Sequence, residues 1–172
     1  MGKRTQKDIR RSVEALSRVE QAIPDGDAAI HRDAATLSDG QTRPVLITNP
    51  ADSGVDAYVS QRIDTDNQIT GTVRQNVTVD TAGTAVDKFN TDIQDSQLDS
   101  TQVVVEQGGS YSGGDANQLP IQTSGVQGQR STPFTATAQY VVRPGANLLY
   151  DITSQANSND FVIEFAVAEV ER

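Results

Sequence analysis

The chain has 172 residues, no cysteine, one histidine and a formal net charge of −9. The absence of cysteine excludes disulfides and thiolate metal sites, and a single histidine excludes a metal site made of several histidines from one chain. The acidic balance argues against general affinity for nucleic acid, because phosphate contacts need Lys and Arg. The length suffices for one domain with a hydrophobic core.

Segments that enter or cross a membrane are not expected from this sequence. No apolar run approaches the roughly 18 residues that span a bilayer. The first residues carry charges but no apolar h-region, so we expect no Sec-type export.

The charge is unevenly distributed along the chain. Residues 1–20 carry a net charge of +3, and the remaining 152 residues carry −12. Asp supplies 17 of the 23 acidic residues and Arg supplies 11 of the 14 basic ones. Much Asp with little Lys is typical of haloadapted proteins, in which strong salt screens the repulsion within a dense carboxylate surface. An ordinary acidic protein of a mesophile is the alternative.

Residues 3–22 are predicted to form an amphipathic helix, which Pro24 and Gly26 then end. Its apolar stripe consists of Ile9, Val13, Leu16, Val19 and Ile23. The basic residues of the segment are Lys3, Arg4, Lys7, Arg10, Arg11 and Arg18. They favour docking on an acidic partner surface or on packaged nucleic acid. Alternatively, they form the solvated face of a helix whose stripe packs on its own domain, on a copy of itself or on a partner.

After residue 28 the hydrophobic period changes from 3.6 to 2, which predicts strands. One strand is expected over Ile69–Asp80, and the last is expected to turn Phe161, Ile163, Phe165 and Val167 to a core. The other predicted strands cover residues 44–48, 57–63, 87–91, 102–106, 135–142 and 147–153. Short strands rich in Val and Thr predict a mainly β fold, an antiparallel β-sandwich of jelly-roll type behind the N-terminal helix. We therefore expect a helical arm over 1–24 and a β-sandwich domain over 25–172.

The segment 107–132 is rich in glycine and poor in large apolar residues, so it is predicted to form a pair of long exposed loops. Tyr111, Asp115 and Arg130 are its candidate contact residues. Its glycine pairs match neither GxxxxGK[ST] nor GxGxxG followed by a helix, so they predict no phosphate site.

Two motifs are candidates for chemistry. His31 has Asp27 and Asp33 nearby, which leaves a Ser-His-Asp site formally open, although no serine stands in a Gly-x-Ser-x-Gly elbow. Asp64-Thr65-Asp66-Asn67 begins like a calcium loop, but loop positions 6 and 12 are Ile69 and Gln75 instead of Gly and Glu. A turn is the better interpretation, and ions bridging Asp-rich loops remain an open alternative.

The C-terminal half of the chain carries a series of motifs in a fixed order. They are Gly83-Thr84, Lys88-Phe89-Asn90, Val103–Glu106, Leu119-Pro120, Gly128-Gln129-Arg130, Val142–Thr153 and Phe161–Val170. This order resembles β-sandwich virion proteins of tailed bacteriophages and related viruses. The resemblance covers about residues 69–170.

The resemblance implies a non-enzymatic structural protein of the virion, made in the host cytoplasm: a capsid decoration, cement or turret component. Together with the acidic composition, it implies a virus of halophilic archaea. The expected partners are the major capsid protein or other virion subunits, and copies of the chain in a homo-oligomer. No cofactor or metal is implied, and direct contact with nucleic acid or a membrane is not expected.

Three alternatives remain open. The chain could be a jelly-roll capsid protein that forms the shell itself, with the basic helix facing inward toward genome or membrane. It could be a tail or spike module that binds host glycans through Tyr111 and Asp115. A hydrolase that uses His31 is the third alternative.

Overall fold

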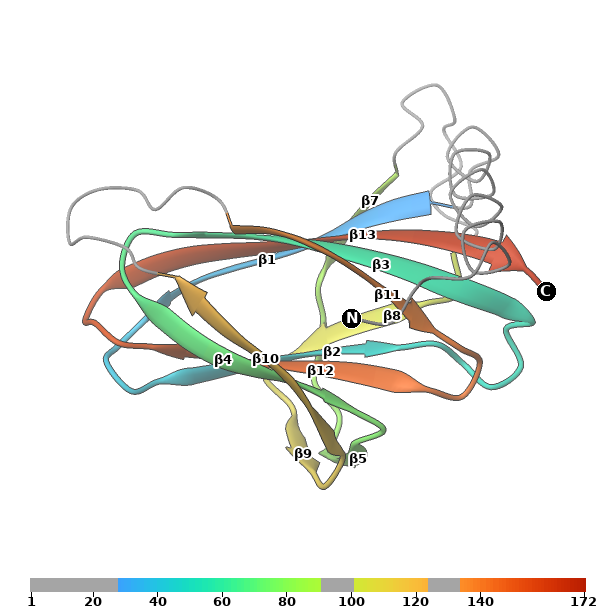
Figure 1. Ribbon diagram of the computed structural model, residues 1–172, viewed down its shortest axis with the longest axis horizontal. Coiled ribbons are helices and arrows are strands. Elements are labelled where there is room, and N and C mark those ends of the chain that lie inside the picture. Colours follow the sequence, from blue (N-terminus) through green and yellow to red (C-terminus); the bar gives the residue numbers. More distant parts are fainter. Residues whose placement is uncertain (1–27, 91–100, 124–133) are drawn as a thin grey trace, which may run out of the picture.

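A computed structural model describes residues 28–90, 101–123 and 134–172. These residues form a mainly β structure without helix (Figure 1). The predicted N-terminal helix, with all its docking residues from Lys3 to Val19, lies outside the described residues, as does Arg130.

Thirteen strands follow one another along the described residues. They are β1 (Ala28–Leu37), β2 (Thr42–Thr48), β3 (Val55–Thr65), β4 (Ile69–Gln75), β5 (Thr78–Thr81), β6 (Thr84–Ala85), β7 (Asp87–Asn90), β8 (Val104–Gln107), β9 (Ser110–Ser112), β10 (Asp115–Thr123), β11 (Phe134–Val142), β12 (Asn147–Ser154) and β13 (Asn159–Glu171).

The strands form two large antiparallel sheets and one small ribbon. The five-stranded sheet has the order β11-β3-β13-β1-β7, and the six-stranded sheet has the order β10-β4-β12-β2-β8-β6. Strands β1 to β4, and again β10 to β13, alternate between the two sheets, which form an upper and a lower layer in Figure 1. The two-stranded β5–β9 ribbon projects below the lower layer.

One hydrophobic core lies between the two large sheets and takes side chains from both. The predicted face of the last strand, Phe161 to Val167 at every second residue, is confirmed, because all four side chains are buried in this core. The ring of Phe165 lies 4.9 Å from that of Tyr150 on β12, so the two layers meet through aromatic contact. The alternating apolar side chains of β13 and β12 therefore point into the core, as the sequence predicts.

The predicted single strand over Ile69–Asp80 is wrong, because it breaks into β4 and β5. Asn76 between them has φ = 55°, the left-handed conformation that Asn tolerates better than most residues. The chain leaves the six-stranded sheet at this residue. The described residues between 76 and 114 then add β7 to one sheet and β8 and β6 to the other.

The prediction of a loop pair over 107–132 is also wrong for much of its described part. This part contains the end of β8 and the strands β9 and β10. Gly109 and Gly114 permit close approach of neighbouring atoms, whereas Gly108 and Gly113 have positive φ and open space around them. Strand β1 is an addition that the sequence pattern did not predict.

Candidate functional site

An aromatic side chain packs the β5–β9 ribbon against the outer face of the six-stranded sheet. Tyr111 of β9 packs against the small apolar cluster of Leu46, Val77 and Leu149. Its hydroxyl oxygen is buried, and burial, with the charge of Glu106 as a second cause, raises the pKa of the phenol. Tyr111 is therefore anchored on the folded body through its hydroxyl end, while the side chain as a whole is only half-buried.

Glycines are required around Tyr111 because no side chain fits there. A Cβ at Gly109 would overlap the Tyr111 hydroxyl and lie 2.7 Å from the carbonyl oxygen of Thr81. A Cβ at Gly83 would lie 2.5 Å from the carbonyl oxygen of Gln107. Both distances are shorter than any real Cβ contact, so the two positions admit glycine alone without a backbone shift.

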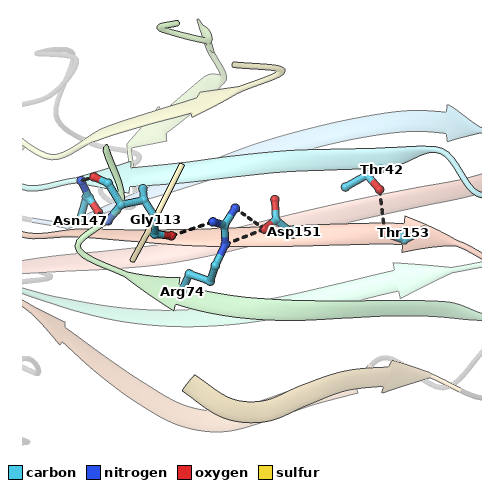
Figure 2. Close-up of polar contacts among 7 residues, drawn as sticks. Thr42, Arg74, Gly113, Asn147, Asp151 and Thr153 are labelled. Carbon is cyan, nitrogen blue, oxygen red and sulfur yellow. Dashed lines mark hydrogen bonds and ion pairs between the residues drawn. The ribbon is translucent and has the colours of Figure 1, made fainter. Parts of the chain in front are cut away.

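Polar side chains of the six-stranded sheet hold the ribbon at its two ends. The Asn147 amide accepts a hydrogen bond from the backbone N–H of Val77 at 2.8 Å and donates one to its carbonyl oxygen at 2.9 Å. Arg74 donates to the Asp151 carboxylate at 3.0 and 2.8 Å and to the carbonyl oxygen of Gly113 at 2.8 Å, as Figure 2 shows. The ribbon is therefore a fixed projection from the sheet.

The remaining predicted loop residue, Asp115, is exposed at the start of β10. The ribbon itself exposes Val79, and Ser112 donates a hydrogen bond to the Asp80 carboxylate at 3.0 Å. The ribbon thus presents a small, mixed polar and apolar surface that could contact a partner.

A groove of about 490 Å³ opens at the edge of the two layers. It lies where β7 pairs with Ala29 to Arg32 of β1 but not with the rest of that strand. Its lining includes Arg32, Asp33, Arg43, Val86, Asp87 and Phe89. The groove is therefore rimmed by charges of both signs.

An ion pair between the two layers lines this groove. Arg43 of β2 donates to both carboxylate oxygens of Asp33 on β1, at 2.9 and 2.8 Å. The hydrogen bond to Asp33 raises the pKa of Arg43. The two-point pair therefore connects the two sheets through a charge-assisted contact.

His31 does not lie where a substrate would reach it. Its side chain is 2% exposed on the inner face of β1, in register between Phe165 of β13 and Lys88 of β7. Asp33 binds Arg43, and Asp27 lies outside the described residues. This geometry does not support the Ser-His-Asp alternative.

In the Asp64–Asn67 segment, Asp64 and Thr65 end β3, and Asp66 and Asn67 begin the turn to β4. The side-chain oxygen of Asn159 accepts hydrogen bonds from the Asn67 N–H at 2.8 Å and from the Thr65 hydroxyl at 2.9 Å. Within the described ranges, no group of three or more His, Asp or Glu side chains could hold a metal ion. The geometry thus agrees with a turn held by a buried asparagine.

Sequence reasoning missed the residues that fix the ribbon and connect the sheets: Arg74, Asp151, Asn147, Asp33 and Arg43. In β1 the structure shows inward positions of AAIHRDAATL alternating with exposed ones. Those inward positions include His31 and Asp33, however, so they do not form a hydrophobic pattern. The partners lie in other strands, and no local spacing indicates them.

No protein-family model matches the chain, and no curated protein or solved structure matches it significantly. Among the residues that the structure describes, no helix is long and apolar enough to cross a membrane.

Proposed function

We propose that this chain is a non-enzymatic structural protein of a virus particle. In this proposal a β-sandwich of jelly-roll type forms a rigid body that decorates or cements a capsid through contacts between subunits. Residues 1–24 dock on neighbouring virion subunits, and the acidic body suits a virus of halophilic archaea.

The strand order is the observation that carries the proposal. Counting β1 to β4 and β10 to β13 as strands one to eight, one sheet has the order 6-3-8-1 and the other 5-4-7-2. Two Greek keys folded together produce this order in a jelly roll, an architecture of viral capsid and lectin domains. A fold alone does not define a function, so the motifs that resemble virion proteins supply the second support.

Attachment to the particle tests the decoration proposal. Purified particles that contain the chain would be stripped of it and then incubated with the full chain or with residues 25–172. We expect the full chain to rebind and the truncated chain to remain in solution while it still unfolds cooperatively, which shows that the β domain is folded. Equal rebinding by the folded truncated chain would contradict docking through residues 1–24.

A shell-forming capsid protein is the second candidate, because the same strand order fits it. The two candidates differ in what the purified chain forms without other subunits. Decoration predicts monomers or small oligomers in light scattering and electron microscopy. Closed particles formed by this chain alone would favour the shell protein.

A further inference from the structure

An apolar patch lies on the outer face of the five-stranded sheet, opposite the core. We define it by Val141, Tyr58, Ala166, Ile30 and Phe89, each from a different strand. Phe89 is 50% exposed, Val141 48% and Ile30 36%, and Tyr58 is half-buried. Exposed large apolar residues scattered singly are ordinary, but five strands that expose apolar groups side by side mark a contact surface.

The register shows that the patch is continuous. Phe89 pairs with Ile30, and Ile30 pairs with Ala166. In the next row Val141 pairs with Tyr58, and Tyr58 pairs with Ala168. Residues two apart in a strand share a face, so both rows lie on the same side of the sheet. None of these positions carries a charge, although the chain is strongly acidic.

The chain outside the structure leads directly into this patch. Twenty-seven residues precede Ala28, which pairs with Ala168 in the second row. The apolar stripe predicted for residues 3–22 ends at Ile23, and five peptide steps from Ile23 to Ala28 span at most about 18 Å. A lone amphipathic helix of this length is marginal in water and needs a surface for its stripe. The apolar stripe can therefore be buried against the apolar patch, and the short connection from Ile23 to Ala28 keeps the two within reach of each other.

We propose that residues 3–22 of the same chain dock their apolar stripe on this patch and leave the basic face outward. Lys3, Arg4, Lys7, Arg10 and Arg11 then form the surface that meets an acidic partner. This inference deepens the proposed function and rests on it only for the role of the basic face. In this arrangement the apolar stripe contacts the five-stranded sheet of the same chain, and the basic residues contact the partner.

The same chain is favoured over a second copy because of the short connection. A short linker gives the attached segment an effective concentration of about millimolar order. A second copy in dilute solution competes at its actual concentration, which is far lower. Docking within one chain is therefore the expected state of the free protein.

Disulfide trapping distinguishes the two arrangements, and the natural absence of cysteine gives a clean background. The full-length double variant Val19→Cys with Ile30→Cys would be oxidised and run on a non-reducing gel. We expect a cross-linked monomer, whereas Arg18→Cys with Ile30→Cys, on the opposite helix face, cross-links far less. Cross-linked dimers, or equal trapping by both pairs, would overturn the proposal.

Limited trypsin digestion provides a second measurement that does not depend on cysteine placement. Cleavage after Arg10, Arg11 and Arg18 should accelerate about tenfold or more in Ile30→Asp with Phe89→Asp, because proteolysis follows the population of the undocked state. Ala34→Asp, exposed on the same face of β1 but outside the patch, should leave the rate unchanged. Equal rates in all three proteins would refute docking on this patch. Both experiments use the free protein, so their failure would leave the attachment test of the proposed function intact.

Discussion

Asp33 of β1 and Arg43 of β2 form a two-point ion pair that joins the two sheets at the edge of the core. The side chain of Asp33 is 8% exposed and that of Arg43 is 24% exposed. Because β1 and β2 belong to different layers, the pair fixes the distance between the layers where the apolar core ends. Both side chains also line the groove at this edge.

Asp33→Asn is expected to lower the free energy of unfolding by about 2–3 kcal/mol, which is less than the roughly 3–5 kcal/mol for a fully buried pair because Arg43 is partly exposed. The substitution conserves volume but leaves the Arg43 charge without its counter-ion in a largely buried position. Urea unfolding followed by circular dichroism measures the loss.

Asp64→Asn is the matched control, because Asp64 pairs with Arg62 at 2.9 Å with side chains 40% and 53% exposed. An exposed pair is worth less than about 1 kcal/mol. Equal losses in the two variants would show that the inter-sheet pair has no special role.

The strands that the sequence predicted and those that it missed differ in one physical respect. β13 and β12 bury large apolar residues at every second position, so local alternation was sufficient. β1 buries His31 and Asp33, and Asp33 is compatible with burial only because Arg43 reaches it from the other sheet. Such a strand becomes recognisable only after the tertiary pairing is known.

The loop prediction for the glycine-rich segment 107–132 was wrong for a similar reason, because the structure of the segment depends on contacts that local sequence does not show. Its composition predicts few core-forming side chains, but it does not show that atoms of other segments occupy the space where a side chain would lie at Gly109 and Gly114. Tyr111 packs against Leu46 and Leu149, and these contacts join segments that are far apart in the sequence. The composition did not indicate that β9 packs on this cluster or that β10 pairs with β4 in the six-stranded sheet.

Gly114→Ala is expected to loosen the β5–β9 ribbon much more than Gly113→Ala. Both glycines have positive φ, at 84° and 64°, so both substitutions share a backbone cost of about 1–2 kcal/mol. Only at Gly114 would the new Cβ also meet other atoms, with Val77 Cγ1 at 2.6 Å and the Gln75 carbonyl oxygen at 2.7 Å. Gly113 has open space around it.

Amide hydrogen exchange in the ribbon is the appropriate measurement, because it reports local opening separately from global unfolding. The amide of Val77, which donates to Asn147, should lose protection in Gly114→Ala and retain most of it in Gly113→Ala. If both variants exchanged alike, crowding at Gly114 would not be the reason for glycine there.

Tyr150→Phe is expected to stabilise the protein by about 1 kcal/mol at neutral pH, because it removes a buried hydroxyl that lacks a partner. Tyr150 is fully buried against Phe165, and among the described residues its hydroxyl makes no hydrogen bond. Tyr58→Phe, on the outer face, is the control and should change the unfolding free energy little. Destabilisation by Tyr150→Phe would indicate that the hydroxyl is bonded.

The same substitution should weaken the alkaline loss of stability. Burial, with the neighbouring Tyr140 as a second cause, raises the pKa of Tyr150 far above its ordinary value. The unfolded phenol loses its proton near pH 10, so unfolding releases protons above about pH 10 and stability falls as the pH rises. Burial also raises the pKa of Tyr140. Part of the alkaline loss of stability should therefore remain in Tyr150→Phe. An identical slope in both proteins would contradict the assignment.

Stability is expected to increase from low to molar salt, because the net charge of −9 makes the folded chain repel itself. At about 1 M ionic strength the Debye length is about 3 Å, so only contacts such as Asp33–Arg43 retain most of their attraction. Thermal unfolding in potassium chloride and in an uncharged osmolyte of equal osmolality separates charge screening from exclusion of the cosolvent. We expect the midpoint to rise more in the salt, and most of that rise should occur below 1 M. A midpoint that is the same in low salt and molar salt would remove the argument for a halophilic source and leave an ordinary acidic protein.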